Sequence, residues 1–186
     1  MATWPLKKEA RVAGIDDGRY EKGSEQTPVV MTVYRLDGRI EGLLKGSITT
    51  DGDDSSRVIA EMLNESRFMD QVRCIISDGA CLGGFNVLDM DDLFGRTSLP
   101  VITASDERPD TPSIMEALKE NFGDWRRRLG IIESHEPCPI ELPDGICYIR
   151  VKGISKEFAS DTVRRATLQG RTPEPVRISH IVASLL

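Results

Sequence analysis

Two apolar stretches of the sequence end in aspartate followed by glycine, and carboxylates in such positions could bind a metal ion. The stretch RVAGIDDG (residues 11–18) carries Asp16 and Asp17, and VRCIISDG (residues 72–79) carries Asp78. Carboxylates at the ends of core strands are good ligands for Mg²⁺, and Mn²⁺ accepts the same oxygen ligands. We expect these three aspartates to be metal ligands. Because Asp-Gly pairs are also common turn residues, a purely structural role is the alternative.

A third acidic segment, TTDGDD, lies directly before a predicted helix and could complete the site. Two Mg²⁺ ions held by carboxylates can activate water and stabilise the leaving oxygen when a phosphodiester is cleaved. Without a cation, clustered carboxylates repel one another, and the pKa of at least one of them rises. The pattern predicts a metal-dependent phosphodiesterase whose catalytic carboxylates are Asp16, Asp78 and either Asp51 or Asp54.

A glycine-rich segment and a C-terminal arginine are the candidate contacts to nucleic acid. In GGFNVLD, Gly83 and Gly84 allow close backbone approach to a ligand. Phe85 could stack on a base, and Asn86 could hydrogen-bond a base edge or cap the following helix. A tight loop with Phe85 in the core is the alternative. Arg177, in PEPVRISH, could bind a phosphate through paired hydrogen bonds or form a surface ion pair.

The order of the predicted elements decides whether these residues meet. The apolar period changes several times along the chain between two and about 3.6 residues. Strands are predicted at residues 11–16, 28–36, 39–50, 72–79, 99–105 and 146–153. Helices are predicted at residues 54–69, 87–94, 111–121 with an extension through 125–130, 155–168 and, after a break at 173–175, 177–186. His180 in the last helix is expected to be a core or surface histidine, because no nucleophile partner is visible in the sequence.

Three antiparallel strands, a helix, and then alternating strands and helices predict an α/β fold. Its mixed sheet would be an antiparallel meander followed by parallel strands, flanked by helices, and this order resembles the ribonuclease H-like fold. The first and fourth strands would lie side by side, so that Asp16 or Asp17 approaches Asp78. We expect one domain over residues 1–186, a length that suits one well-buried core.

Composition limits the partners of the chain. With 30 acidic and 24 basic residues the net charge is −6, which argues against a strongly basic protein that coats nucleic acid. A local basic patch such as WRRRLG still allows backbone contact. No stretch is long enough to span a membrane and no signal-peptide core is present, so a cytoplasmic location is expected. The four cysteines lack metal-binding spacing and are expected to be reduced.

Several of these segments together resemble a known family. The segments GIDDG, GGFNVLD and PEPVRISH, in that order, are similar to an archaeal family catalogued as domain of unknown function ninety-nine, which is similar to endonuclease V. Some of its members act on deoxyuridine-containing DNA. The resemblance implies a Mg²⁺- or Mn²⁺-dependent DNA-repair endonuclease for uracil-bearing DNA. Asp16 or Asp17 would match the first-strand aspartate of endonuclease V, Asp78 the fourth-strand aspartate, and Asp51 or Asp54 the intervening glutamate.

The recognition elements of endonuclease V do not carry over to this sequence. Neither its lesion-reading wedge nor its HPR segment is recognisable, and GGFNVLD occupies the place of the latter. The base lesion and the choice between DNA and RNA therefore stay open. The alternative function is a non-catalytic nucleic-acid- or partner-binding protein that retains the fold, and metal binding at the strand ends would separate the two functions. The apolar C-terminus IVASLL could pack between the subunits of a homodimer.

Overall fold

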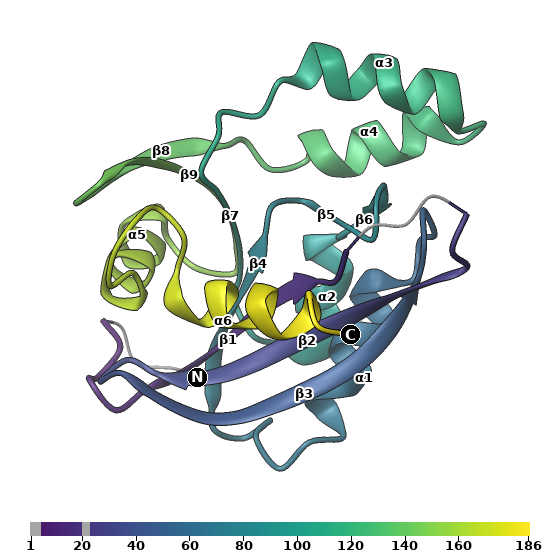
Figure 1. The fold of residues 1–186 in the computed structure, drawn as a ribbon. Coiled ribbons are helices and arrows are strands. Elements are labelled where there is room, and N and C mark those ends of the chain that lie inside the picture. Colours follow the sequence, from purple (N-terminus) through teal and green to yellow (C-terminus); the bar gives the residue numbers. More distant parts are fainter. Residues whose placement is uncertain (1–4, 20–22) are drawn as a thin grey trace.

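A mixed sheet of seven strands, in the order β3-β2-β1-β4-β7-β9-β8, organises the computed structural model, which describes residues 5–19 and 23–186 (Figure 1). The strands β1, β2 and β3 form an antiparallel meander, whereas β1, β4 and β7 run parallel to one another. A separate ribbon pairs β5 with β6. The strands are β1 (Arg11–Asp17), β2 (Gln26–Arg35), β3 (Arg39–Thr49), β4 (Val72–Asp78), β5 (Cys81–Leu82), β6 (Asn86–Val87), β7 (Val101–Ser105), β8 (Cys138–Leu142) and β9 (Gly145–Lys152).

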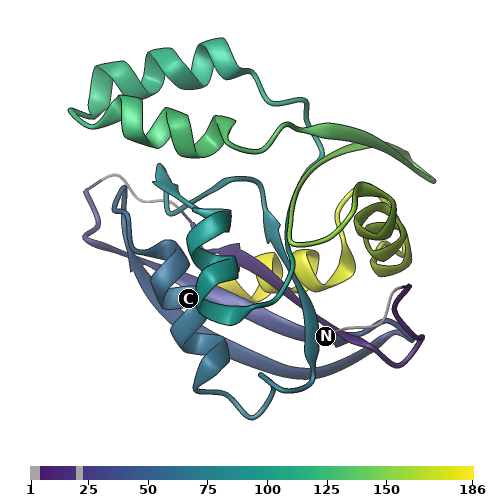
Figure 2. The same ribbon diagram turned by 180° about the vertical axis from the view of Figure 1, so that it is seen from behind.

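Helices cover both faces of the sheet. In Figure 1, α6 lies in front of β1 and β2 with α1 and α2 behind the sheet, and Figure 2 shows the reverse order from the other side. The pair α3 and α4 forms a layer beyond one end of the sheet. The helices are α1 (Ser55–Asn64), α2 (Met90–Thr97), α3 (Thr111–Asn121), α4 (Trp125–Glu133), α5 (Lys156–Ala166) and α6 (Glu174–Ala183).

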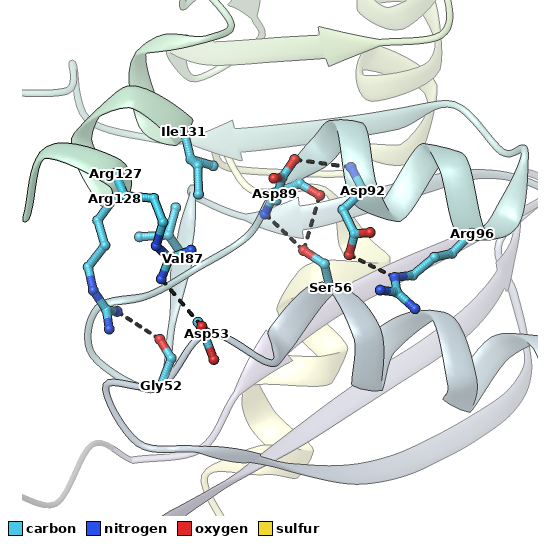
Figure 3. Close-up of a pocket in the computed structure, with 10 residues that line it drawn as sticks. All are labelled: Gly52, Asp53, Ser56, Val87, Asp89, Asp92, Arg96, Arg127, Arg128 and Ile131. Carbon is cyan, nitrogen blue, oxygen red and sulfur yellow. Dashed lines mark hydrogen bonds and ion pairs between the residues drawn. The ribbon is translucent and has the colours of Figure 1, made fainter. Parts of the chain in front are cut away.

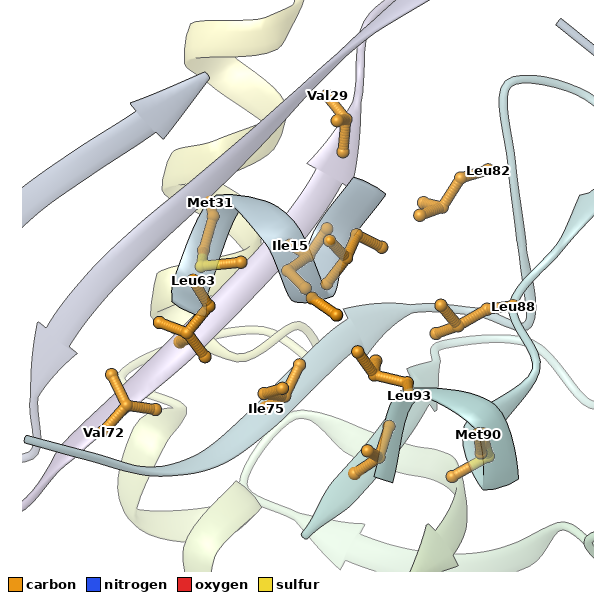
Figure 4. Close-up of a cluster of buried hydrophobic side chains, with 14 of the residues drawn as sticks. Ile15, Val29, Met31, Leu63, Val72, Ile75, Leu82, Leu88, Met90 and Leu93 are labelled. Atoms are coloured by element: carbon orange, nitrogen blue, oxygen red, sulfur yellow. The ribbon is translucent and has the colours of Figure 1, made fainter. Parts of the chain in front are cut away.

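Each face of the sheet has its own hydrophobic core, because side chains alternate along a strand. Ile15 of β1 and Ile75 of β4 pack with α1 and α2 in the core drawn in Figure 4. Val12 and Ile76, from the same two strands, pack on the opposite face with residues of α5 and α6. Burial of each such side chain contributes about 1.5–3 kcal/mol. The central strands are therefore fixed from both sides.

A glycine in β1 allows α6 to lie directly on the sheet. A Cβ atom at Gly14 would come within 2.3 Å of the backbone carbonyl carbon of Pro175. The Ser179 hydroxyl lies 2.9 Å from the carbonyl oxygen of Gly14, to which it donates, and 2.8 Å from the hydroxyl of Thr32. Both hydroxyls are buried. These contacts fix α6 over the carboxyl end of β1.

Two predicted helices have different ends in the structure. The helix predicted over residues 54–69 stops at Asn64, because the Ser66 hydroxyl bonds to the Leu63 carbonyl and accepts the Phe68 N–H, closing a turn. The predicted break at 173–175 is wrong, since α6 begins at Glu174. A proline in the first helical turn needs no N–H partner and starts a helix readily.

Other differences come from local hydrogen bonding and from proline. Helix α2 begins at Met90 rather than near residue 87, because the Asp89 side chain accepts the N–H groups of Asp91 and Asp92. Helix α4 is separate from α3. Strand β8 was not expected; it contains Pro139 and lies at the edge of the sheet, where proline is tolerated. The ribbon of β5 and β6 was not expected either.

All four cysteines are free thiols, two of them buried. None of the helices in the part of the chain that the structure describes has the length and apolar character needed to cross a bilayer.

Candidate functional site

Asp16 and Asp78 end two neighbouring parallel strands at the centre of the sheet. In the pairing of β1 with β4, Gly14 lies opposite Ile76. Asp16 and Asp78 each follow two positions later. The two aspartates therefore lie level with each other, on the same face of the sheet as Gly14 and Ile76. Gly14 touches α6, and Ile76 belongs to the core on that side. The topology thus brings the two carboxylates together beneath α6.

These carboxylates are crowded by negative charge. Burial, followed by repulsion from Asp78 and Asp17, raises the pKa of Asp16 to about 8, although the Asp17 N–H donates to it. The Asp78 side chain reaches solvent, yet partial removal from water and repulsion from Asp17 and Asp106 raise its pKa as well. Among the described residues, neither Asp16 nor Asp78 forms an ion pair with a lysine or arginine. A divalent cation would relieve this repulsion.

His180 joins the pair from α6. Its Nδ1 lies 2.9 Å from Oδ2 of Asp16, and its side chain is 65% exposed, in contrast to the buried carboxylate. It also lies near enough to Asp78 to oppose the rise in that pKa. This contact could not be predicted from the sequence, because the two residues lie 164 positions apart along the chain. The signal that could have found it is PEPVRISH, a helix start followed by an isolated histidine.

Asp17 is the last residue of β1 and directly follows Asp16. Its Oδ2 accepts the Gly83 N–H at 2.7 Å and so fastens the glycine-rich segment to β1. Asp17 stays a predicted metal ligand, with one carboxylate oxygen engaged by Gly83 and its charge acting on Asp16. Its charge still acts on Asp78.

Asp51 and Asp54 do not supply the expected third ligand. The Asp54 carboxylate accepts the Thr49 N–H at 3.0 Å and the Asn86 side-chain amide at 2.7 Å. Asp51 accepts the Phe85 N–H at 2.8 Å. Within residues 5–19 and 23–186, no group of three or more His, Cys, Asp or Glu side chains is placed to hold a metal ion. The third metal ligand that was expected from Asp51 or Asp54 is therefore not brought to Asp16 and Asp78.

The glycine-rich segment is mostly structural. Gly83 and Gly84 have φ values of +52° and +82°, which explains both glycines. Asn86 is fully buried, accepts the Ser55 N–H at the start of α1 and donates to the Thr49 carbonyl, so its predicted contact with a base is wrong. Phe85 packs edge-on against Phe122 with ring centroids 5.6 Å apart. Its ring belongs to a small core under α3 and α4, as the alternative prediction had it.

Arg177 forms the ion pair that was the alternative to phosphate binding. Its Nε donates to Oε2 of Glu174 at 2.9 Å and its Nη2 donates to Oε1 of the same carboxylate. The two residues lie one helical turn apart, and the pairing lowers the pKa of Glu174. The guanidinium is already held in the bidentate geometry that a phosphate would need. A phosphate contact by Arg177 is therefore not supported.

Two arginines of WRRRLG, Arg127 and Arg128, are also paired with carboxylates. They line a pocket of about 280 Å³ between α1, α2 and α4 (Figure 3). There Arg127 pairs with Asp53, and Arg128 donates to the Gly52 carbonyl at 2.7 Å. Arg96 in the same pocket pairs with Asp92. This pocket therefore has little uncompensated positive charge for a phosphate.

A second pocket, of about 380 Å³, adjoins Asp78. It lies between the carboxyl ends of the parallel strands and the α3–α4 layer, since Gly79, Phe85 and Ile114 all line it. Carboxyl ends of parallel strands are the usual position of ligand sites in α/β proteins. Arg150 of β9 also lines this pocket and is buried.

Most of the chain matches a protein family. The family model described as endonuclease dU matches residues 8–186. The chain belongs to the endonuclease dU family. The UPF0215 protein of Methanothermobacter thermautotrophicus is 38% identical over 189 residues, which cover 96% of this chain and 88% of that protein. The relation to nucleases that the motifs predicted is thus supported, although the match does not carry the number ninety-nine.

Solved structures extend the comparison of this endonuclease dU family member to its fold. A protein of unknown function from Archaeoglobus fulgidus is 32% identical, with a TM-score of 0.84 and coverage of 95% of this chain and 97% of that one. Ciona intestinalis endonuclease V, solved with a 24mer DNA containing an inosine followed by a ribo-adenosine, is 15% identical. Its TM-score is 0.60, over 91% of this chain and 82% of that one. The predicted ribonuclease H-like fold is confirmed.

Proposed function

We propose that this protein is an endonuclease that requires Mg²⁺ or Mn²⁺ and cleaves DNA at or near deaminated bases such as uracil, in DNA repair. The observation that carries the proposal is the pair of crowded carboxylates, Asp16 and Asp78, at the ends of adjacent strands with no lysine or arginine partner. Two carboxylates without a neutralising cation are costly for a fold to keep unless an ion binds there.

The donor set fits a hard divalent cation. Mg²⁺ in nucleic-acid enzymes is bound through one or two carboxylates, with waters and substrate phosphates completing the octahedron. Asp16 and Asp78 would hold it, and Asp78 is exposed, so that water or a substrate phosphate could reach an ion bound there. When bound, the ion supplies Lewis-acid stabilisation of the charge that develops on the scissile phosphate.

His180 is the candidate for proton transfer. The contact between its Nδ1 and Asp16 orients the imidazole, and the exposed side chain leaves Nε2 open to solvent and substrate. A histidine oriented by a carboxylate can take a proton from the attacking water or give one to the leaving oxygen. The contacts of Ser179 with Gly14 and Thr32 keep the histidine at this place.

The nucleic-acid substrate is supported by similarity. The matching family is described as endonuclease dU, and the endonuclease V of similar fold was solved with an inosine-containing DNA. Uracil and the hypoxanthine of inosine are both products of base deamination. We therefore propose DNA with a deaminated base as substrate and include RNA in the test below.

The experiment that tests this function is cleavage of labelled oligonucleotides carrying uracil, hypoxanthine or normal bases, as DNA and as RNA, with Mg²⁺, Mn²⁺ or chelator. Wild type is compared with Asp16→Asn and Asp78→Asn. We expect cleavage of uracil-bearing DNA with either metal, and loss of cleavage with chelator and in both variants. If folded wild-type protein binds every oligonucleotide but cleaves none, the non-catalytic binding protein is the correct function instead.

Self-association remains a separate prediction. Ile181, Leu185 and Leu186 at the C-terminal end are exposed, and their apolar surface is consistent with the predicted homodimer. Light scattering of the wild type and of Leu185→Ser measures the mass directly. A wild-type mass equal to that of one chain would contradict the homodimer.

A further inference from the structure

Arg150 is a buried cation without a carboxylate partner. It is 7% exposed, and burial lowers its pKa. Its Nε donates to the backbone carbonyl of His135 at 3.0 Å. Among residues 5–19 and 23–186 no carboxylate lies within ion-pair distance of it, and its side chain forms no further hydrogen bond with these residues. The other buried arginine, Arg128, has Asp124 as its ion-pair partner.

Arg150 lines the pocket beside Asp78. This pocket, at about 380 Å³, falls in the size range of small-molecule sites. Much of its lining is apolar, contributed by Ala80, Cys81, Phe85, Pro109, Ile114 and Ile132. The Phe85 wall is held in place, because Arg128 donates to its carbonyl at 2.6 Å and Phe122 supports its ring.

The charges around the pocket favour a neutral ligand over a phosphate. Three carboxylates line it, from Asp78, Glu107 and Asp110, against the two arginines Arg108 and Arg150. An anionic phosphate would be repelled by this majority of negative charge. A planar nucleobase, by contrast, is neutral, packs well between apolar walls and still needs polar partners for its edge.

The chemistry of arginine then determines which base edge is accepted. A guanidinium has five N–H donors and no acceptor, and here one donor is used by the His135 carbonyl. An exocyclic carbonyl can accept from the remaining donors, whereas an exocyclic amine would place donor against donor. Deamination of cytosine replaces the amine at C4 with a carbonyl, which gives uracil.

We propose that Arg150 is a specificity-determining residue, which accepts uracil over cytosine by donating hydrogen bonds to the carbonyl at C4 of a base placed in the pocket beside Asp78. This inference rests on the proposed function, because it assumes a nucleic-acid substrate. It assigns to the buried arginine the discrimination for which no wedge is recognisable in the sequence. A site that hydrogen-bonds one group of a ligand rejects the analogue lacking it, since the buried donors are left unpaired.

The test is the binding, with chelator present, of three fluorescent single-stranded DNAs that differ only in one residue: deoxyuridine, deoxycytidine or an abasic site. Wild type should bind the deoxyuridine strand about 10–100-fold more tightly than the deoxycytidine strand. Arg150→Gln should lose this preference, because its amide oxygen accepts from an amine, whereas Arg150→Lys should keep part of it. Arg96→Gln removes the same charge outside the pocket and should keep the full preference.

Three results would overturn the proposal: no uracil preference in folded wild type, an unchanged preference in Arg150→Gln, or an equal loss of affinity for all three strands. The last would mean a backbone contact instead of a base contact. Circular dichroism verifies that each variant is folded. Because no cleavage is measured, a preference that depends on Arg150 in a protein that never cleaves would support this inference and contradict the proposed catalysis.

Discussion

Two groups of aspartates in this protein have opposite electrostatic surroundings. At the ends of β1 and β4, removal from water and repulsion from neighbouring carboxylates raise the pKa values of Asp16 and Asp78. Before α1, burial alone would raise the pKa of Asp54, but hydrogen bonds from Asn86 and Thr49 lower it. In the sequence the two groups look alike, as aspartates near glycine. The donors around a carboxylate, which only the fold provides, distinguish a structural group from a candidate metal ligand.

The largest expected contrast is in catalysis. Asp78→Asn should lower the rate of cleavage of uracil-bearing DNA by more than about 100-fold, because loss of a second-sphere partner of a metal already costs about 10–100-fold and a direct ligand costs more. Asp54→Asn should cleave at close to the wild-type rate per folded molecule. Initial rates at saturating Mg²⁺ measure both. An equal loss in the two variants would remove the distinction between the two groups.

His180 and His135 provide the same kind of comparison for the proposed proton transfer. His180→Gln should lower the cleavage rate by at least about 100-fold, the usual effect of losing a general acid or base. His135, which contacts Asp91 at the start of α2, is the matched control, and His135→Gln should keep its rate. The Mg²⁺ affinity of each variant is measured alongside its cleavage rate, so that weaker metal binding is distinguished from slower proton transfer. A similar decrease in both variants would argue against a specific role for His180.

The structural group should respond in stability instead of in chemistry. Asn86→Ala removes the partner of the Ser55 N–H and of the Thr49 carbonyl and leaves the side chain of Asp54 with fewer donors. Because each unsatisfied buried group costs about 1–3 kcal/mol, the free energy of unfolding should fall by at least about 2 kcal/mol. Urea unfolding measures it. A loss below about 0.5 kcal/mol would show that this network is not structural.

The smallest expected effect is on pH dependence without metal. The raised pKa of Asp16 means that the folded protein holds a proton that the unfolded chain releases above about pH 4. The contribution of Asp16 to stability is therefore fully present below about pH 4 and is lost as the pH rises through about 8, the pKa of Asp16 in the folded protein. Asp16→Asn should therefore raise the stability of the metal-free protein at pH 8 by about 1 kcal/mol or more. Asp54→Asn should lower it, because the depressed pKa of Asp54 contributes stability above about pH 4. Thermal unfolding from pH 4 to pH 8 with chelator measures the change in stability of each variant. Changes of the same sign in the two variants would contradict the comparison.

The sequence was sufficient for the arrangement of Asp16 and Asp78. Apolar runs with a period of two, separated by a helix, define the order of the strands, and parallel pairing of β1 with β4 then brings their carboxyl ends together. That information is local, because each strand carries its own pattern. The Asp-Gly ending shows where the strand stops.

The roles of His180, Asn86 and Arg150 could not be predicted in the same way. His180 reaches Asp16 only because Gly14 lets α6 lie on β1, a contact between the two ends of the chain. Asn86 looked like an exposed loop residue, yet its amide meets donors and acceptors from separate segments. Arg150 lies among mainly apolar residues of β9. A charged residue in such a strand was the sequence feature that could have drawn attention to it.

Mn²⁺ binding, followed by electron paramagnetic resonance in the presence of a uracil-bearing oligonucleotide, tests whether the crowded carboxylates form a metal site. Wild type and Asp54→Asn should bind the ion with similar affinity, whereas Asp16→Asn and Asp78→Asn should bind it at least about tenfold more weakly. Equal binding by all four folded proteins would place the metal elsewhere and contradict the assignment of Asp16 and Asp78.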